Sequence, residues 1–338
     1  MKWLAFDIGG VKIKAADGDG YVASHNFPLW QTPEHLSETL RAMIAQAPRA
    51  DHMAATMTGE LADCFTTKAE GVQYILDALI RAADGRHARI YLTNGRLVAP
   101  PIALRQPLLA AASNWHALAS FAGRYARTGP ALLIDIGSTT TDIIPLRSGA
   151  PCASGATDPE RLASGELVYT GVERSPLCAL LREASWRGQM LPVAQELFAT
   201  TFDVYLTLGD LPEEPHSSQT ADRRPATAAA ACSRLARMVC ADGTMFDEND
   251  AHALAASAGA AQRTLVAAAL AKVLGRMAEP PAVAIVSGRG EFLARSVLEE
   301  LIPGARLVSL GAELGSEVSR CVTAHALAVL AREGPRAA

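Results

Sequence analysis

The chain has 338 residues, of which 49% are hydrophobic and 20% are charged, and its formal net charge is −4. At about 150 residues per domain this length predicts two domains, and the apolar share is sufficient for two cores. A weakly negative chain without a run of Lys and Arg is not expected to bind nucleic acid. We see neither a secretory leader nor an apolar stretch of about 18 residues, so we expect a cytoplasmic protein that does not span a membrane.

The cysteines and histidines show no pattern of a metal site. The six cysteines form no CxxC pair, and the eight histidines lack metal-ligand spacing. We therefore expect reduced thiols and no zinc. Cys178 and Cys240 have no identifiable His partner, which disfavours covalent catalysis.

The first part of the chain opens with three predicted strands that form a β-meander, at residues 3–7, 11–15 and 21–27. Helices and strands then alternate by their hydrophobic spacing. The predicted helices cover residues 33–47, 71–83 and 108–125, and the strands cover residues 52–57 and 90–92. A break at Thr128-Gly129-Pro130 ends this part, so we predict an N-terminal lobe over residues 1–129.

The pattern then starts again with strands at residues 131–135 and 141–146. A less regular segment over about residues 151–248 is interpreted as an insertion. Beyond it the predicted helices cover residues 250–277, 291–301 and 314–331, and the strands cover residues 283–286 and 306–309. We predict a C-terminal lobe over residues 130–338, with the last helix, 314–331, at the junction between the lobes.

An apolar strand that ends in Asp-Ile-Gly occurs twice, at Asp7-Ile8-Gly9 and at Asp135-Ile136-Gly137. Each copy is followed by a second strand and then by alternating strands and helices. Chance can produce a match of three residues, but the shared context favours duplication of a domain.

In the first copy a strand delivers the carboxylate of Asp7 to a turn that contains Gly9 and Gly10. Glycine allows positive φ and the close approach of a ligand, and backbone N–H groups in such a turn can bind an anion. Because a carboxylate repels phosphate, Asp7 would hold a Mg²⁺ ion that bridges to the phosphate. The alternative is a plain hairpin turn, where Asp and Gly are common.

The second copy adds hydroxyl groups to the same pattern, because Ser138, Thr139 and Thr140 follow Gly137, and an acid stands at each end of residues 135–142. Hydroxyls and amides suit phosphate oxygens, whereas carboxylates suit Mg²⁺. The alternative is a hairpin in which threonine supports strand formation. A duplicated fold would place the two turns on either side of one oligophosphate.

A third candidate, Ser287-Gly288-Arg289-Gly290, joins a predicted buried strand to a helix. Glycines beside a helix N-terminus give a place where a ligand can pack closely. The segment is weak alone, and it matches neither GxGxxG nor a Walker A sequence.

Together, the three turns and a late Gly-Ala-Glu-Leu-Gly segment resemble the ASKHA superfamily, and residues 134–142 are similar to its hydantoinase/oxoprolinase branch. Further segments are similar to one family, the tetrahydromethanopterin-linked one-carbon transfer pathway proteins. These segments are residues 57–65, 112–115, 165–171, 220–222 and 234–238. The resemblance extends over nearly the whole chain, and its segments are specific only in combination.

The resemblance implies an α/β fold of two duplicated RNase H-like lobes, as in actin, Hsp70 and sugar kinases, around a central cleft. Archaeal members act in methanofuran biosynthesis. The implied activity joins a furanylmethyl diphosphate to the phenol of a tyramine- or tyrosine-type acceptor, forming an aryl ether and releasing diphosphate. Mg²⁺ is the expected cofactor, whereas ATP is compatible with this activity but not required. A homodimer is also compatible with the sequence.

The turns and the chemistry of the implied reaction together give expected roles to individual residues. Asp7 and Asp135 would hold the metal, and the catalytic candidates are Asp135, Asp142 and Glu60, in that order. The groups expected to bind the phosphorylated ligand are Gly9, Gly10, Lys14, Gly137, Ser138, Thr139, Thr140, Ser287, Gly288 and Gly290. Lys12 stands where the family usually has Asn, which puts the role of that Asn in doubt.

Two other functions stay open. The chain would be an ATP-dependent kinase or hydantoinase/oxoprolinase-type ATPase if residues 287–291 contact an adenosine, or else a non-catalytic nucleotide-binding regulator. Some residues have an alternative role too. Glu60 would stabilise a helix N-terminus instead of lining a cleft, and the loop around Asp222 is either a lid or a solvated connection.

Overall fold

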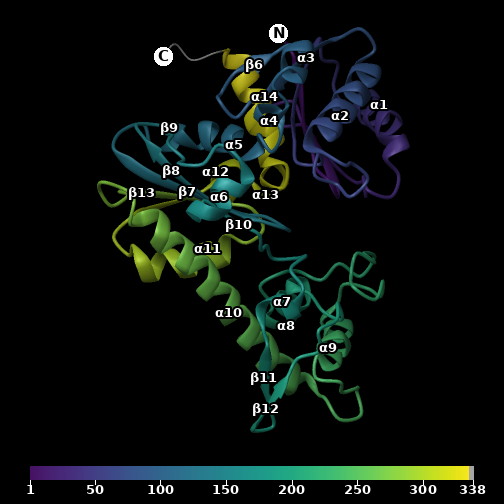
Figure 1. The fold of residues 1–338 in the computed structure, drawn as a ribbon, viewed down its shortest axis with the longest axis vertical. Coiled ribbons are helices and arrows are strands. Elements are labelled where there is room, and N and C mark those ends of the chain that lie inside the picture. Colours follow the sequence, from purple (N-terminus) through teal and green to yellow (C-terminus); the bar gives the residue numbers. More distant parts are fainter. Residues whose placement is uncertain (335–338) are drawn as a thin grey trace.

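The structure is a computed structural model that describes residues 1–334 as two α/β lobes and a smaller subdomain (Figure 1). The first lobe is built on a sheet with the strand order β3-β2-β1-β4-β5-β6. Its strands are β1 (Trp3–Ile8), β2 (Lys12–Ala16), β3 (Val22–Asn26), β4 (His52–Met57), β5 (His87–Tyr91) and β6 (Leu97–Val98). β1 is antiparallel to β2 and parallel to β4, so the predicted meander leads into the parallel part of the sheet.

The second sheet repeats this arrangement in the order β10-β8-β7-β13-β14, with β9 also paired to β8. Its strands are β7 (Pro130–Ile136), β8 (Thr141–Arg147), β9 (Ala150–Pro151), β10 (Leu167–Val168), β13 (Val283–Ser287) and β14 (Arg306–Ser309). β7 is antiparallel to β8 and parallel to β13, as β1 is to β2 and β4. The shared topology confirms the predicted fold class of two duplicated lobes.

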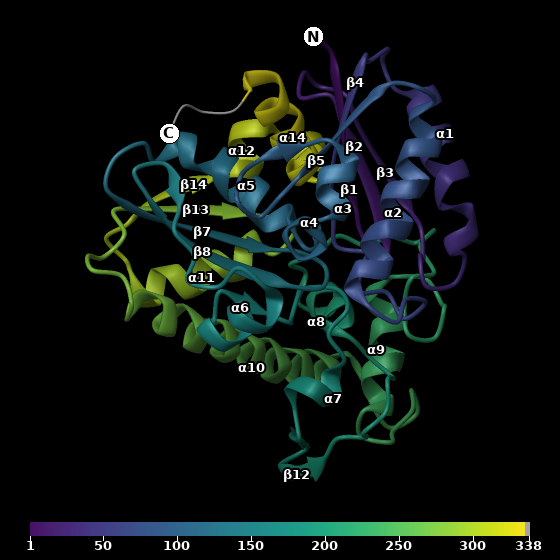
Figure 2. The same cartoon turned by 45° about the horizontal axis from the view of Figure 1, so that its top comes forward.

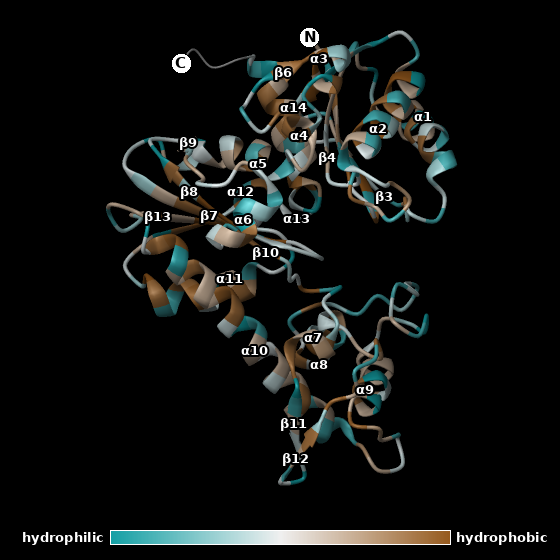
Figure 3. Ribbon diagram, in the orientation of Figure 1, coloured by the Kyte–Doolittle hydropathy of each residue, from teal (hydrophilic) through white to brown (hydrophobic). Residues whose placement is uncertain are grey.

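Helices cover the sheets, and the apolar strands lie between them (Figure 3). α1 and α2 pack on the outer face of the first sheet, and α10 and α11 pack on the outer face of the second. The helices of the lobes are η1 (Pro33–His35), α1 (Leu36–Gln46), α2 (Lys68–Ala83), α3 (Pro100–Leu104), α4 (Pro107–Ala110), α5 (Asn114–Ala122), η2 (Gly123–Tyr125), α6 (Asp158–Ser164), α10 (Glu248–Leu274), α11 (Glu291–Leu301), α12 (Leu310–Leu314), α13 (Ser316–Ser319) and α14 (Val322–Glu333).

The helices α5 and α14 lie between the two sheets and belong to both cores (Figure 2). On one side, Leu327 of α14 packs with Ala5 and Ala54 of the first sheet. On the other side, Trp115 of α5 packs with Leu133 of the second sheet. This shared layer fixes the lobes against each other at their inner faces.

Two predicted helices are interrupted. The helix predicted over residues 108–125 is divided into α4, α5 and η2, with Ala112 at φ +47° between the first two. In the helix predicted over residues 314–331, Gly315 at φ +83° separates the end of α12 from α13, and Arg320 and Cys321 separate α13 from α14. A left-handed residue ends a helix, and hydrophobic spacing alone does not show where one occurs.

Residues 177–237 of the predicted insertion form a subdomain on the N-terminal half of α10, whereas β9, α6 and β10 of the same predicted segment belong to the second lobe (Figure 1). The elements of the subdomain are α7 (Leu177–Leu180), β11 (Glu183–Trp186), β12 (Gln189–Pro192), α8 (Thr201–Leu208) and α9 (Ala228–Arg237). Within residues 1–334, α10 is the one helix long and apolar enough to span a membrane by length and composition. It contacts α8, α9 and α11, and its Leu254, Val266 and Leu270 are buried, so it is a packing helix between lobe and subdomain.

A buried arginine holds this subdomain together. Arg234 of α9 is fully buried, and its Nε donates to Asp203 of α8 at 2.7 Å. Its Nη1 donates to Asp222 at 3.1 Å, and the half-exposed Arg237 contacts the same carboxylate at 3.4 Å. The segments 220–222 and 234–238 therefore meet in space, and Asp222 anchors its loop to α9.

We expect Arg234→Met to lower the free energy of unfolding by about 3–5 kcal/mol, because Asp203 would stay buried without its cation. The matched variant Arg237→Met removes an exposed partner of the same Asp222 and should cost less than about 1 kcal/mol. Urea unfolding followed by circular dichroism measures both. Equal effects of the two variants would show that the buried pair does not stabilise the subdomain.

Candidate functional site

Two carboxylates end the duplicated strands at the inner faces of the lobes, Asp7 on β1 and Asp135 on β7. Asp7 is 7% exposed, and within residues 1–334 the Oδ1 atoms of both side chains are buried without a hydrogen-bond partner. Lys14, directly opposite Asp7 on β2, lowers the pKa of both carboxyls against the effect of their burial. The charges of Asp7, Asp135 and Lys14 therefore influence one another across the two lobes.

Burial raises the pKa of Asp135 to about 6, and the charges of Asp142 and Asp7 raise it as well. Ser287, its register partner on β13, and Lys14 lower this pKa. The raised pKa values of Asp7 and Asp135 show that their charges are poorly compensated by the surrounding protein, which suits a cation. In residues 1–334 no group of three or more His, Cys, Asp or Glu side chains is placed to hold a metal. Mg²⁺ fits such a site, since it is usually bound by one or two carboxylates, phosphate oxygens and water.

The two acidic turns have the same backbone hydrogen bond. The N–H of Gly9 donates to the carbonyl of Lys12 at 3.0 Å, and the N–H of Gly137 donates to the carbonyl of Thr140 at 2.9 Å. A Cβ added at Gly10 would meet no described atom within 4 Å, so the first turn is open there. The duplication therefore extends to the geometry of the turns.

The third predicted turn closes over the second. Gly288 has φ +87°, and a Cβ there would lie 2.3 Å from the carbonyl oxygen of Ile136 and 2.9 Å from Oδ1 of Asp135. A Cβ at Gly290 would lie 2.4 Å from Cγ2 of Ile136. Glycine is thus required for close packing, and the fold brings Ser287, Gly288 and Gly290 beside Asp135.

A further loop, residues 170–175, supports the second turn and was not assigned a role from the sequence. A Cβ at Gly171 would lie 2.5 Å from the N atom of Thr139. The N–H groups of Val172 and Glu173 donate to the carbonyls of Gly137 and Ser138 at 3.0 and 3.1 Å. In the sequence, this loop is indicated by Gly171, which ends the segment 165–171.

The buried Gln262 of α10 fixes this loop. Its side-chain amide donates to Thr170 Oγ1 at 2.8 Å and to the Gly171 carbonyl at 2.9 Å. It also accepts a hydrogen bond from Tyr205 of α8 at 2.5 Å. The second turn is therefore connected to the subdomain through a buried polar network.

The candidate Asp142 lies directly opposite Asp135 in the β7–β8 pair. Its Oδ1 accepts a hydrogen bond from Nη2 of Arg161 at 2.6 Å, and Arg161 is itself 1% exposed. The Arg161 guanidinium lies over the ring of Trp115, with Cζ 4.2 Å from the ring centroid. With this partner Asp142 is poorly placed as a base, although its catalytic role stays a prediction.

The candidate Glu60 follows β4 and is 1% exposed, and its Oε2 atom has no hydrogen-bond partner in the described chain. Burial raises the pKa of Glu60 to about 7, Lys68 lowers it and Asp158 raises it. Lys68 of α2 and Asp158 of α6 pair at 2.5 Å and join the lobes. Glu60 therefore lies at the junction of the lobes with a carboxyl group able to hold a proton near neutral pH.

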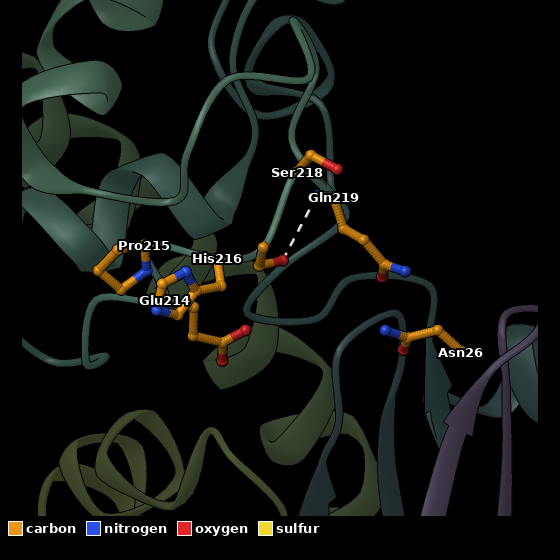
Figure 4. A pocket seen from close by; sticks show the side chains of 7 residues that line it. Asn26, Glu214, Pro215, His216, Ser218 and Gln219 are labelled. Carbon is orange, nitrogen blue, oxygen red and sulfur yellow. Dashed lines mark hydrogen bonds between the residues drawn. The ribbon is translucent and has the colours of Figure 1, made fainter.

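A solvent-open hollow of about 470 Å³ lies between the edge strand β3 of the first lobe and the subdomain (Figure 4). One wall is Asn26 at the end of β3, and the other is the subdomain loop 214–219. Its described lining includes none of the predicted site residues. Residues 216–219 of the loop that contains Asp222 therefore line a solvent-open recess.

The raised pKa of Glu60 predicts a pH effect on stability. Between the ordinary pKa of a glutamic acid and about 7, the folded protein binds more protons than the unfolded chain, so its stability falls as pH rises through this window. Glu60→Gln should abolish that loss and gain on the order of 3 kcal/mol over the wild type between about pH 5 and about pH 8. The exposed Glu299→Gln is the control for chemical denaturation at both pH values. A constant difference between Glu60→Gln and wild type would contradict a raised pKa at Glu60.

Comparison with known proteins assigns a family. The model of the hydantoinase/oxoprolinase family matches residues 51–320. Over 330 residues the chain is 31% identical to the (4-{4-[2-(gamma-L-glutamylamino)ethyl]phenoxymethyl}furan-2-yl)methanamine synthase of Methanocaldococcus jannaschii, covering 97% of this chain and 96% of the relative. It is 30% identical over 201 residues to the synthase of the same name from Methanococcus vannielii, covering 59% of this chain and 89% of the relative.

Solved structures resemble the chain in outline. The activator of the 2-hydroxyisocaproyl-CoA dehydratase from Clostridium difficile is 13% identical, with a TM-score of 0.46, and the match covers 97% of this chain and 93% of that one. An archaeal actin homologue is 10% identical, with a TM-score of 0.43 and coverage of 99% and 100%. These scores are too low to carry a functional argument. The family match and the full-length relative nevertheless confirm the resemblance noted in the sequence, and the chain belongs to the hydantoinase/oxoprolinase family.

Proposed function

We propose that this protein is a biosynthetic transferase that joins a furanylmethyl diphosphate to the phenol of a tyramine- or tyrosine-type acceptor and releases diphosphate. The observation that carries the proposal is the pair of buried carboxylates with free oxygens, Asp7 and Asp135, beside two matching glycine turns. The name of the relative from M. jannaschii supports it, since its product contains a phenoxymethyl-furan, which is an aryl ether. The polar substrates are those of a cytoplasmic enzyme.

In this reaction the phenol oxygen forms a bond to the methylene carbon of the furan. The bond from that carbon to diphosphate breaks, and the electron pair leaves with the diphosphate. Asp7 and Asp135 would hold Mg²⁺, which stabilises charge that develops on the departing oxygens. The open turn at Gly10, the Ser138 and Thr139 hydroxyls, and nearby amides would orient the diphosphate.

The phenol must also lose its proton, because its ordinary pKa is about 10. A carboxylate with a raised pKa is better matched to this transfer than an ordinary one. Glu60 and Asp135 both have a raised pKa and a buried oxygen without a described partner, whereas Arg161 occupies Asp142. Because Asp135 would hold the metal, we place Glu60 ahead of Asp142 as the proton acceptor.

Asp135→Asn should lower kcat and kcat/KM together, by on the order of 10²–10³, because it removes charge needed mainly in the transition state. The exposed Asp51→Asn is the matched control and should behave as wild type. Turnover is measured by mass spectrometry with a furanylmethyl diphosphate, tyramine or tyrosine, and Mg²⁺. Wild-type rates in folded Asp135→Asn would remove this residue from the mechanism.

Binding of inorganic diphosphate should require Mg²⁺, since the carboxylates of Asp7 and Asp135 repel the bare anion. Calorimetry should detect binding with Mg²⁺ and none in EDTA. Equal affinity under both conditions would refute the metal role. ATP hydrolysis measured in parallel, at a rate above that of the ether-forming reaction, would favour the ATPase alternative.

A further inference from the structure

Lys12 begins β2 directly after the first acidic turn, and its carbonyl accepts the hydrogen bond from the N–H of Gly9. Side chains alternate between the two faces of a strand, so Lys12 lies on the same face as Lys14, whereas Ile13 packs in the core of the first lobe. Lys14 is the residue opposite Asp7 at the candidate site. Two positions along a strand correspond to roughly 7 Å, so a second cation lies beside the first acidic turn.

The side chain of Lys12 reaches from the first lobe to the second. Its Nζ lies 3.5 Å from Oε2 of Glu173, and 28% of the Lys12 side chain and 11% of the Glu173 side chain are exposed. The N–H of Glu173 donates to the carbonyl of Ser138, in the second acidic turn, at 3.1 Å. The Lys12 side chain therefore links the two turns that we propose to hold the diphosphate.

Glu173 is shared between two cations. Its Oε1 accepts a hydrogen bond from Nη1 of Arg289, in the third turn, at 2.8 Å. That distance is typical of a charge-assisted hydrogen bond, whereas the contact with Lys12 is longer. Within residues 1–334 Glu173 is the one acidic side chain paired with Lys12, while Arg289 also pairs with the more exposed Glu214 at 3.0 Å. Arg289 is thus the closer partner of Glu173, and Lys12 is held less firmly.

An ion pair of this kind is easily exchanged for a stronger anion. Partly exposed pairs contribute little to stability, so little is lost when Lys12 leaves Glu173. Phosphate oxygens form strong charge-assisted hydrogen bonds with an ammonium group. After the exchange Glu173 keeps its hydrogen bond from Arg289, so no buried carboxylate is left without a partner. The arrangement therefore supplies a cation to an entering anion at low cost.

We propose that Lys12 is a further binding residue of the diphosphate group. Its ammonium leaves Glu173 when the phosphorylated ligand enters between the turns, and it then binds phosphate oxygens while Glu173 stays with Arg289. This inference rests on the proposed function, and it adds to that function a residue that was not among those expected to bind the ligand. Glu173 acts in it as the internal competitor of the ligand for Lys12.

The first test is calorimetry with inorganic diphosphate and Mg²⁺. Lys12→Met removes the charge and keeps a side chain of similar length, so it should weaken binding about tenfold. Lys12→Arg keeps the charge and should retain most of the affinity. The exposed Lys2→Met, on the same lobe, is the matched control and should bind as wild type does.

Glu173→Gln distinguishes exchange from a merely structural contact between the lobes. If Glu173 competes with the ligand, this variant should bind Mg²⁺-diphosphate about threefold more tightly, and the gain should shrink in the Lys12→Met background. A structural contact predicts instead that Lys12→Met and Glu173→Gln both weaken binding. The exposed Glu299→Gln is the control for the loss of one negative charge.

Wild-type affinity in Lys12→Met, or weaker binding in both Lys12→Met and Glu173→Gln, overturns the role of Lys12. Neither result affects the proposed transfer, which is judged separately by ether formation in mass spectrometry. If Lys12→Met weakens and Glu173→Gln tightens the binding of Mg²⁺-diphosphate but no ether forms, the proposed transfer fails and the role of Lys12 in phosphate binding stands.

Discussion

The packing of α5 and α14 between the two sheets is the constraint on which the site depends. Small residues on the inner face of the first sheet, Ala5 and Ala54, let Leu327 approach closely, while Trp115 packs against the second sheet. Burying one leucine-sized apolar side chain contributes roughly 1.5–3 kcal/mol to the stability of the fold. That packing offsets the cost of burying Oδ1 of Asp7 and Oδ1 of Asp135, which have no hydrogen-bond partner within residues 1–334.

The sequence was sufficient for the parts of the fold that repeat. The strands that end at Asp7 and Asp135 were predicted because the same short pattern returns in the same context, and the structure shows both with matching turn hydrogen bonds. Hydrophobic spacing also located the long helix at residues 250–277, which is α10 over Glu248–Leu274. These signals are local, so each can be recognised within a short window of sequence.

The rest of the site depends on partners that are distant in the chain. Lys12 and Glu173 are separated by 161 positions, and no pattern around either residue indicates the other. The hydrogen bond from Arg161 to Asp142 forms because α6 folds back onto β8. The positions of acidic residues in the sequence do not reveal that arrangement. The strands β9 and β10 have two residues each, which is too short for a periodic pattern in the sequence. They are recognised only by their pairing with β8 in the folded sheet.

The helix α10 has a mechanical consequence for the two lobes. Its 27 residues span about 40 Å at 1.5 Å per residue, from the outer face of the second sheet to the core of the subdomain. Because one continuous helix packs on the subdomain at one end and on the second lobe at the other, the two should move as one rigid unit. A rotation of the lobes relative to each other would therefore move loop 214–219 away from Asn26 and open the hollow between them. A molecule that contacts both walls would oppose such a rotation.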